Sequence, residues 1–456
     1  MGRCPCVSEG IFFMGYIQGE GRSQGTLFPV VLDDLIPIEH LCRVIDAFVD
    51  GLAMSELSFE RAEAAETGRP GYDPRDLLKL YLYGYLNQIR SSRRLEAECR
   101  RNVELMWLLG RLYPDHKSIA EFRRMHRDAI TAVGAELVRF ARSCGLIRGE
   151  WVAIDGTKFR AVSSTDSVRE RQALEKYLES MEKADDEQQV GIDPTAVQAA
   201  LEKLRQHAEP EAHFMPVAHT KAPAYNVQTA VDAEHALIVA HAITLNAGDG
   251  DCLEPMAEAA RKALNCTDPI NILADRGYSN GEQASRCEKA GLIPHVPSRR
   301  GINNKGDGSM LDRSAFLYQP ETDSFLCPEG KILKRLALSR KDRAVYYQAE
   351  ANDCGNCPMK SGCTQAPKRL LTRHLYDDVL NRMRQRATPD KMRLRRCTVE
   401  HPFATLKYRI FGHPRFLLRG LKGAHTEISL AVMAYNIKRM VNVLGAAHLT
   451  SILTTA

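Results

Sequence analysis

The period of the hydrophobic pattern changes near Gly149, and this change constrains the fold more than any other feature of the chain. Before it, apolar residues recur with helical spacing, as at Leu41, Val44, Ile45 and Phe48. After it, short apolar runs of the strand type alternate with helical stretches. The sequence therefore predicts helices first, followed by a mixed sheet that is covered by helices.

The second part of the chain supplies five apolar runs of strand length. They lie at residues 151–154, 225–231, 237–244, 270–274 and 292–296. Helical stretches follow the first run as an insertion and separate the last three runs. The order is thus strand, inserted helices, two strands of a hairpin, helix, strand, helix and strand. This order predicts a mixed α/β domain.

Composition narrows the class of protein only slightly. The chain has 456 residues, of which 44% are hydrophobic and 26% charged, values close to those of soluble globular proteins. No apolar run reaches the roughly 18 residues that a membrane span requires. Thirteen cysteines, an odd number, make a poor disulfide framework and fit a reducing cytosol. Met14 could be the true start, which would make the first residues an extension.

Basic residues are concentrated near the end of the chain. Although the formal net charge is only +5, the stretch from Lys368 to Lys422 holds 15 Lys or Arg residues against 4 acids. Such a stretch suits a polyanion such as nucleic acid, but a solvated basic face would have the same composition.

A second basic feature lies in the helical part. Ser118 and Glu121 have the spacing of a capping box that begins a helix with Arg123, Arg124 and Arg127. A short helix with a basic outer face could enter a DNA groove. A helical bundle with solvated arginines is the alternative.

Three acids stand where chemistry is expected. Asp155 and Asp275 each end an apolar strand and are followed closely by Gly156 and Gly277, which would let the chain turn sharply. The third acid, Glu400, lies in a predicted helix. Convergent carboxylates surrounded by basic residues could hold two divalent cations. Such ions would activate a water or a 3′-hydroxyl and stabilise the leaving oxygen of a phosphodiester.

Each acid also has a plain structural explanation. An Asp-Gly pair after a strand commonly forms a turn. Arg396, Glu400 and Lys407 are spaced so that they share one helical face, and Glu400 with Arg396 could be an ordinary helical ion pair. Asp249 and Asp251 precede a helix and are expected to cap it. Only the combination of the three acids favours a catalytic site.

The segments around the three acids resemble the DDE transposases of bacterial insertion sequences. They read Ile-Asp-Gly-Thr-Lys at 154–158, Ala-Asp-Arg-Gly-Tyr at 274–278 and Val-Glu-His-Pro-Phe at 399–403. The family signature Y-x2-R-x3-E-x6-K is matched by Arg396, Glu400 and Lys407, while Arg393 stands at the tyrosine position. The Cys-bearing stretch between Asp275 and Glu400 is similar to that of the eleven-eighty-two branch.

The resemblance implies a ribonuclease-H-like catalytic domain in which Asp155, Asp275 and Glu400 bind two Mg²⁺ ions, which Mn²⁺ could replace. It implies double-stranded DNA as the partner, at the element ends and at the target, and a homodimer on that DNA. Arg396, Lys407, Arg123, Arg124 and Arg127 are the expected DNA contacts. The expected location is the bacterial cytoplasm, on the nucleoid and not in a membrane.

The expected organisation has five segments. They are an N-terminal extension (1–25), a helical DNA-binding domain (26–148), the first part of the ribonuclease-H-like domain (149–297) with a helical insertion (166–208), a Cys-rich insertion (298–388) and C-terminal helices that complete the catalytic domain (389–456). Two other functions remain open: a domesticated DNA-binding protein without catalysis, and a Mg²⁺-dependent nuclease without strand transfer.

Four cysteines in the second insertion have the spacing of metal ligands. Cys327, Cys354, Cys357 and Cys363 form C-x26-C-x2-C-x5-C, which could close a structural Zn²⁺ site. Free thiols and an iron-sulfur cluster are the alternatives. A structural ion would stabilise an insertion with little apolar content of its own.

Overall fold

The computed structural model describes residues 31–60, 71–182, 193–205, 209–217, 220–297, 310–341 and 343–455. The expected extension 1–25 and the alternative start at Met14 lie outside these residues. None of the described helices is both long enough and apolar enough to cross a bilayer.

Helices make up the ordered elements before Gly149, as the periodicity predicts. They are η1 (Leu32–Leu35), α1 (Leu41–Asp50), α2 (Pro74–Leu86), α3 (Ser92–Cys99), α4 (Val103–Leu108), α5 (His116–Met125) and α6 (Arg127–Ser143). The expected capping box at Ser118 does not begin α5. The carboxylate of Asp115 caps it instead, accepting from the backbone N–H groups of Lys117 (2.9 Å) and Ser118 (3.1 Å).

The central sheet contains six strands. They are β1 (Trp151–Arg160), β2 (His213–Val217), β3 (Thr220–Asp232), β4 (Ile238–Thr244), β5 (Ile270–Leu273) and β6 (Leu292–His295). β1 pairs antiparallel with β3 on one side and parallel with β5 on the other, and β6 lies parallel beside β5. β2 and β4 pair with different stretches of β3.

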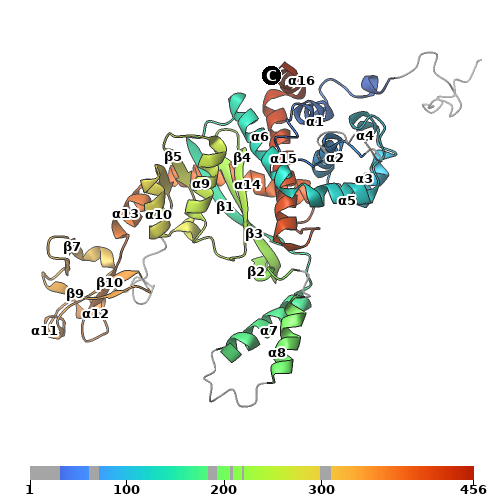
Figure 1. The fold of residues 1–456 in the computed structure, drawn as a ribbon. Helices are drawn as coiled ribbons and strands as arrows, with labels where there is room; N and C mark the ends of the chain where they lie inside the picture. Colours follow the sequence, from blue (N-terminus) through green and yellow to red (C-terminus); the bar gives the residue numbers. More distant parts are fainter. Residues whose placement is uncertain are drawn as a thin grey trace, which may run out of the picture.

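This topology confirms the predicted fold class. Apart from the short β2, three consecutive antiparallel strands are followed by two parallel strands on the other side of β1, and helices α9 (Leu253–Leu264) and α10 (Gly281–Lys289) make the crossovers. Mixed pairing in this order, with a helix before each parallel strand, is the ribonuclease-H-like arrangement. Figure 1 shows the sheet between these helices and the C-terminal ones.

The C-terminal helices complete the α/β core. They are α13 (Asp377–Arg386), α14 (Pro389–Ala404), the π-helical turn η5 (Thr405–Ile410), α15 (Gly420–Leu444) and α16 (Ala446–Thr455). α14 packs against β1, β3 and β5, and α15 packs against α2, α6 and β4. Because α15 is buried on most sides, one hydrophobic core runs from the N-terminal helices into the sheet.

Two insertions leave this core (Figure 1). The first contains α7 (Thr165–Glu182) and α8 (Pro194–Arg205), which form the expected pair of helices and extend away from the sheet. The second contains a separate antiparallel sheet with its own apolar cluster around Phe325 and Tyr347.

The elements of the second insertion are short. They are η4 (Arg313–Ala315), β7 (Leu317–Gln319), β8 (Ser324–Leu326), β9 (Ile332–Ser339), β10 (Ala344–Gln348), α11 (Ala351–Gly355), α12 (Lys360–Cys363) and β11 (Leu370–His374).

Candidate catalytic site

Two of the predicted acids meet at one edge of the central sheet. The parallel pairing of β1 with β5 ends at Ala153 opposite Leu273, so Asp155 and Asp275 both lie two residues beyond the last pair. A single guanidinium lies between them, because Arg395 Nη2 is 2.6 Å from Asp155 Oδ1 and 3.9 Å from Asp275 Oδ2. Two carboxylates 120 positions apart in sequence thus share one cation.

Asp155 does not end its strand, contrary to the sequence expectation. β1 continues to Arg160, and its pairing with β3 covers Asp155 and Gly156 without a turn. Gly156 is needed for space instead. A Cβ atom there would overlap the Gln228 amide and lie 2.7 Å from Asp249 Oδ1. The glycine therefore admits side chains from β3 and from the loop after β4.

Asp275 lies directly after β5, as expected. Its carboxylate accepts a 2.7 Å hydrogen bond from the backbone N–H of Gly277 and so caps the short helix η3 (Arg276–Tyr278). About half of its side chain is exposed, whereas Asp155 is mostly buried. The pair therefore opens to solvent on the side of Asp275.

Burial makes a negative charge on Asp155 unfavourable. It raises the pKa of Asp155 to about 6, and the charges of Asp275 and Asp249 act in the same direction. The Arg395 guanidinium and the backbone N–H of Gly156 oppose this rise in the pKa. A second positive charge placed here would therefore be stabilising, and carboxylate oxygens are the ligands that Mg²⁺ prefers.

The third acid is not joined to this pair. Glu400 lies on α14 and is exposed, and among the described residues no hydrogen bond or ion pair to its carboxylate is found. Val399 and Phe403 are the buried residues around it. The three predicted acids therefore share one region of the fold, but their ligand atoms do not form a closed set.

The basic residue that faces the acids is Arg395, whereas the motif spacing singles out Arg396. Arg396 is exposed to solvent, one position further round the helix. Arg395 Nε and Nη2 are buried and lack hydrogen bonds of good geometry in the described structure, although Nη2 lies close to Asp155. The ion pair with Asp155 is therefore held by charge more than by directed hydrogen bonds.

Lys407 lies near Asp155 on the π-helical turn η5. Burial lowers the pKa of Lys407, the nearby charge of Lys158 acts in the same direction, and the charge of Asp155 opposes both. The π-helical turn widens the backbone at this point, a feature that recurs at functional sites. Lys407 thus lies within electrostatic reach of Asp155, and its contact with DNA stays a prediction.

Asp249 lies beside this pair, a position that the sequence reasoning missed. We expected it to cap a helix, but the N-cap of α9 is Cys252. Asp249 Oδ1 accepts from the side-chain amides of Gln228 (2.7 Å) and Asn226 (2.8 Å), both buried on β3. Its position just after a strand at the same sheet edge was the signal that could have revealed it.

The expected basic face of the N-terminal helices is only partly present. Arg123 is buried, with its guanidinium 5.0 Å from the centre of the Tyr81 ring and donating to the backbone oxygen of Arg90, so the expectation that it contacts DNA is wrong. Arg124 is exposed and pairs with Glu121. Arg127 belongs to the next helix, α6, and is partly buried.

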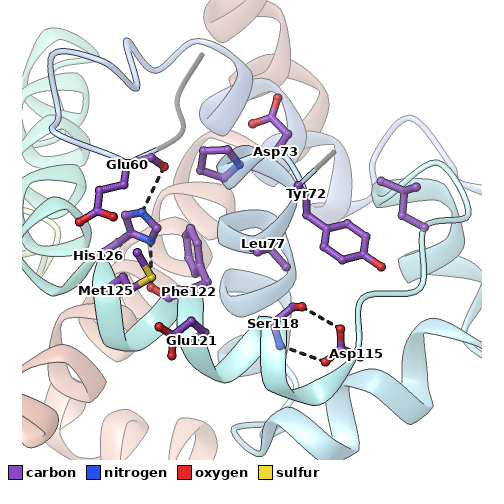
Figure 2. A pocket seen from close by; sticks show the side chains of 13 residues that line it. Glu60, Tyr72, Asp73, Leu77, Asp115, Ser118, Glu121, Phe122, Met125 and His126 are labelled. Carbon is purple, nitrogen blue, oxygen red and sulfur yellow. Dashed lines mark hydrogen bonds between the residues drawn. The ribbon is translucent and has the colours of Figure 1, made fainter. Parts of the chain in front are cut away.

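A cavity of about 660 Å³ lies between α2 and α5, beside these arginines (Figure 2). Four acids contribute to its lining (Glu60, Asp73, Asp115 and Glu121), and no Lys or Arg does. His126 in its wall is satisfied by backbone oxygens of Phe122 and Glu60. An acidic lining repels phosphate, so this cavity is not a DNA-binding site.

The four cysteines of the second insertion lie near one another. Burial raises the pKa of Cys363, the Arg369 guanidinium opposes this rise, and the charges of Cys354, Cys357 and Cys327 add to it. Cys327 Sγ accepts from the backbone N–H of Lys331 at 3.3 Å.

Neither the cysteines nor the three acids form a tight ligand set. Among the described residues, the one trio of candidate ligand atoms that all lie within 4.8 Å of one another is His40, Cys42 and Glu104. His40 Nδ1 accepts from the Cys42 backbone N–H, and Glu104 accepts from the Tyr83 hydroxyl. Protein partners already occupy the His40 and Glu104 atoms, as expected for a hydrogen-bonded helix cap.

Two family models match the chain and show the class of protein. Residues 30–125 match a transposase domain of the DUF772 type, and residues 326–441 match a transposase DDE domain. These matches support a DDE transposase, as the motifs around the acids predict. The matches do not show the branch of insertion sequences.

Other comparisons add little. No curated protein matches the chain. Among solved structures, the chain is similar to a piggyBac transposase in a synaptic complex with hairpin DNA, at 10% identity, with 91% of this chain and 78% of that chain covered. The TM-score of 0.32 is too low to support an argument about fold or function.

Proposed function

We propose that this transposase binds the terminal inverted repeats of an insertion sequence, cleaves the element ends and joins the freed 3′-hydroxyl to target DNA. The eleven-eighty-two branch is the proposed family branch. The observation that carries the proposal is the approach of Asp155 and Asp275 to one cation, Arg395 Nη2, at the sheet edge.

The donor set fits divalent cations. Asp155 and Asp275 offer hard oxygen ligands, and the cation that they share marks a point of strongly negative potential. Two Mg²⁺ ions bound here would supply activation of a water or 3′-hydroxyl and stabilisation of the leaving oxygen, and Mn²⁺ could replace them. Binding requires Arg395 to leave the carboxylates.

Glu400 is the proposed third ligand. It lies on α14, the same helix as Arg395, and that helix packs against β1 and β5, which carry or precede the two aspartates. The exposed side chain has free rotamers on the helix surface. Because Glu400 follows Arg395 by five residues, it points about 140° away from it round the helix, so α14 would have to turn for Glu400 to join the two aspartates.

The proposed DNA contacts are the accessible basic residues near the site and on the N-terminal helices. Arg396 is exposed beside Glu400, and Lys407 lies within electrostatic reach of Asp155. Arg124 and Arg127 remain candidates on α5 and α6 for binding the repeats, with the segment 26–148 as the DNA-binding domain. Lysine and arginine contacts to phosphate position such a protein on a duplex.

The Cys-rich insertion is proposed to hold a structural Zn²⁺. Cys327, Cys354, Cys357 and Cys363 supply four soft ligands, and the backbone N–H that reaches Cys327 Sγ resembles the hydrogen bonds that support thiolates in such knuckles. The small sheet has few buried residues of its own, so an ion would contribute to its stability.

We further propose that the chain acts as a homodimer on paired element ends, in the bacterial cytoplasm on nucleoid DNA. The proposed chain boundaries of the catalytic domain are 149–297 and 389–456, and the packing of helices on the central sheet supports them.

The test is cleavage of labelled element ends by purified protein in Mg²⁺, comparing wild type with Asp275→Ala. Asp251→Ala is the matched control, because Asp251 is exposed on a neighbouring loop and only touches Asn280. We expect wild type and the control to cut and Asp275→Ala to be inactive. Equal cleavage by all three would refute the assignment.

The same reaction separates the other two functions. Joining of cut ends to a second DNA indicates a transposase, and cutting without joining indicates a nuclease. Binding without Mg²⁺-dependent cutting by the wild type would indicate a domesticated DNA-binding protein.

A further inference from the structure

Asp249 has an unusual environment for a loop carboxylate. It lies between β4 and α9 and is not used to cap α9. One of its oxygens, Oδ1, accepts from two neutral amides, Gln228 Nε2 at 2.7 Å and Asn226 Nδ2 at 2.8 Å. The nearest recorded cation, Lys158 Nζ, is 3.6 Å away, beyond a good hydrogen bond.

The two amides are held in a fixed orientation. Gln228 and Asn226 are almost completely buried on β3, and Gln228 also donates to Asn226 Oδ1. The hydroxyl of Tyr278 donates to Gln228 Oε1, which leaves the amide nitrogen to face Asp249. Tyr278 belongs to the motif that contains Asp275, so the motif itself orients the amide that binds Asp249.

Asp249 is also close to Asp275, and its charge acts on Asp155, whose pKa it helps to raise. A Cβ atom on Gly156, the neighbour of Asp155, would lie 2.7 Å from Asp249 Oδ1. A Cβ atom on Gly277 would lie 3.7 Å from Asp249 Oδ2 and 2.9 Å from Asp275 Oδ1. Asp249 Oδ2 and Asp275 Oδ1 therefore lie on either side of the space that a side chain at Gly277 would fill.

The second oxygen remains available. Among the residues that the structure describes, no hydrogen-bond donor reaches Asp249 Oδ2, the oxygen on the side of Gly277. A carboxylate with one oxygen fixed by amides and the other directed toward a cation is a usual arrangement for a metal ligand and its supporting hydrogen bonds.

We propose that Asp249 is a fourth carboxylate of the catalytic pocket, which binds a divalent cation through Oδ2 together with Asp275. This inference rests on the proposed function of that pocket. Gln228 and Asn226 are then positioning residues, since they act through Asp249.

The test is Mn²⁺ binding by the full-length protein without DNA, followed by electron paramagnetic resonance of the free ion. Asp249→Asn keeps an oxygen that can accept from both amides, so it removes the charge with little change of shape. Asp251→Asn, two residues away in the same loop, is the matched control. Asp155→Asn reports on the pocket itself.

We expect Asp249→Asn to weaken Mn²⁺ binding by about tenfold or more and Asp251→Asn to leave it unchanged. Normal binding by Asp249→Asn together with impaired binding by Asp155→Asn would refute the role of Asp249 and leave the pocket intact. Normal binding by both variants would refute the pocket itself, and the proposed function with it.

A second variant addresses misfolding and indirect effects. Asp249→Cys should lose end cleavage in Mg²⁺ and regain it in Mn²⁺, which accepts a thiolate more readily than Mg²⁺ does. A purely structural role of Asp249 would give equal activity, or equal loss, in the two metals, and either result would overturn the proposal.

Discussion

The ion pair between Arg90 and Glu427 should stabilise the packing of the N-terminal helices against the catalytic core. Arg90 Nη1 donates to Glu427 Oε2 at 2.9 Å, and the Glu427 side chain is fully buried. Glu427 Oε1 also accepts from the backbone N–H groups of Leu417 (2.7 Å) and Leu418 (2.6 Å). Arg90 further donates to the backbone oxygens of Arg415 and Phe411.

Removal of the Glu427 charge leaves the buried Arg90 guanidinium without its ion-pair partner. Loss of one member of a buried pair destabilises a protein by about 3 to 5 kcal/mol. For Glu427→Gln we expect a loss of about 3 kcal/mol in the free energy of unfolding, since the glutamine oxygen can still accept from the backbone N–H groups of Leu417 and Leu418. Glu427→Ala also leaves both N–H groups unpaired, at roughly 1 kcal/mol or more each, so we expect about 5 kcal/mol or more.

The assay is urea unfolding followed by circular dichroism, with Glu121→Gln as control. Glu121 and Arg124 form a solvent-exposed pair, for which a loss below about 1 kcal/mol is expected. If Glu427→Gln lost no more free energy of unfolding than Glu121→Gln, the argument that this buried pair unites the two parts would be wrong.

Three further predictions concern the metal sites. Arg395→Gln should tighten Mn²⁺ binding in the absence of DNA, because it removes the cation that competes for Asp155 and Asp275, whereas the exposed control Arg396→Gln should leave binding unchanged. Unchanged or weaker binding by Arg395→Gln in titration calorimetry would contradict this. The pKa of Asp155 is raised to about 6, so protons should compete with the ion for this carboxylate as the pH falls below 6. Below pH 6 the Mn²⁺ affinity should therefore drop by about tenfold per pH unit. An affinity that does not change between pH 7 and pH 5 would exclude Asp155 as a ligand. Purified protein should contain zinc, as measured by atomic emission. The zinc should be lost in Cys354→Ser and kept in the control Cys287→Ser, which changes a buried cysteine outside the cluster. Absence of zinc from the wild type would rule out the structural ion.

The order of elements could be predicted because each strand and helix carries its own local signal. The apolar runs ending near Ile154 and Ala274 are strands in the structure, and the intervening helices follow their periodicity. Asp275 was placed correctly, since a strand that ends before a glycine-containing turn has few alternatives.

Tertiary contacts decided the points that the sequence could not. The sequence suggested that Gly156 forms a turn. A glycine is required there because the side chains of Gln228 and Asp249, which are remote in sequence, fill the space that a side chain would need. Arg123 looked like a surface residue, yet it packs on Tyr81. The choice between Arg395 and Arg396 depends on the rotation of α14 about its own axis, which a spacing motif does not specify.

Asp249 shows the same difficulty at the site itself. Its local sequence fits a helix cap, and only the approach of β3 brings two amides to its carboxylate. The sequence motif around Glu400 matches the family, while its approach to the other acids depends on the rotation of α14 about its own axis.

The central claim is that Asp155 and Asp275 bind a catalytic divalent cation in place of Arg395. Crystals equilibrated with Mn²⁺ and measured at a wavelength where manganese scatters anomalously give the most direct test. We predict an anomalous peak between the two carboxylates, with the Arg395 side chain displaced. A protein that stays free of manganese at this sheet edge at saturating Mn²⁺, with Arg395 still between the acids, would contradict the claim.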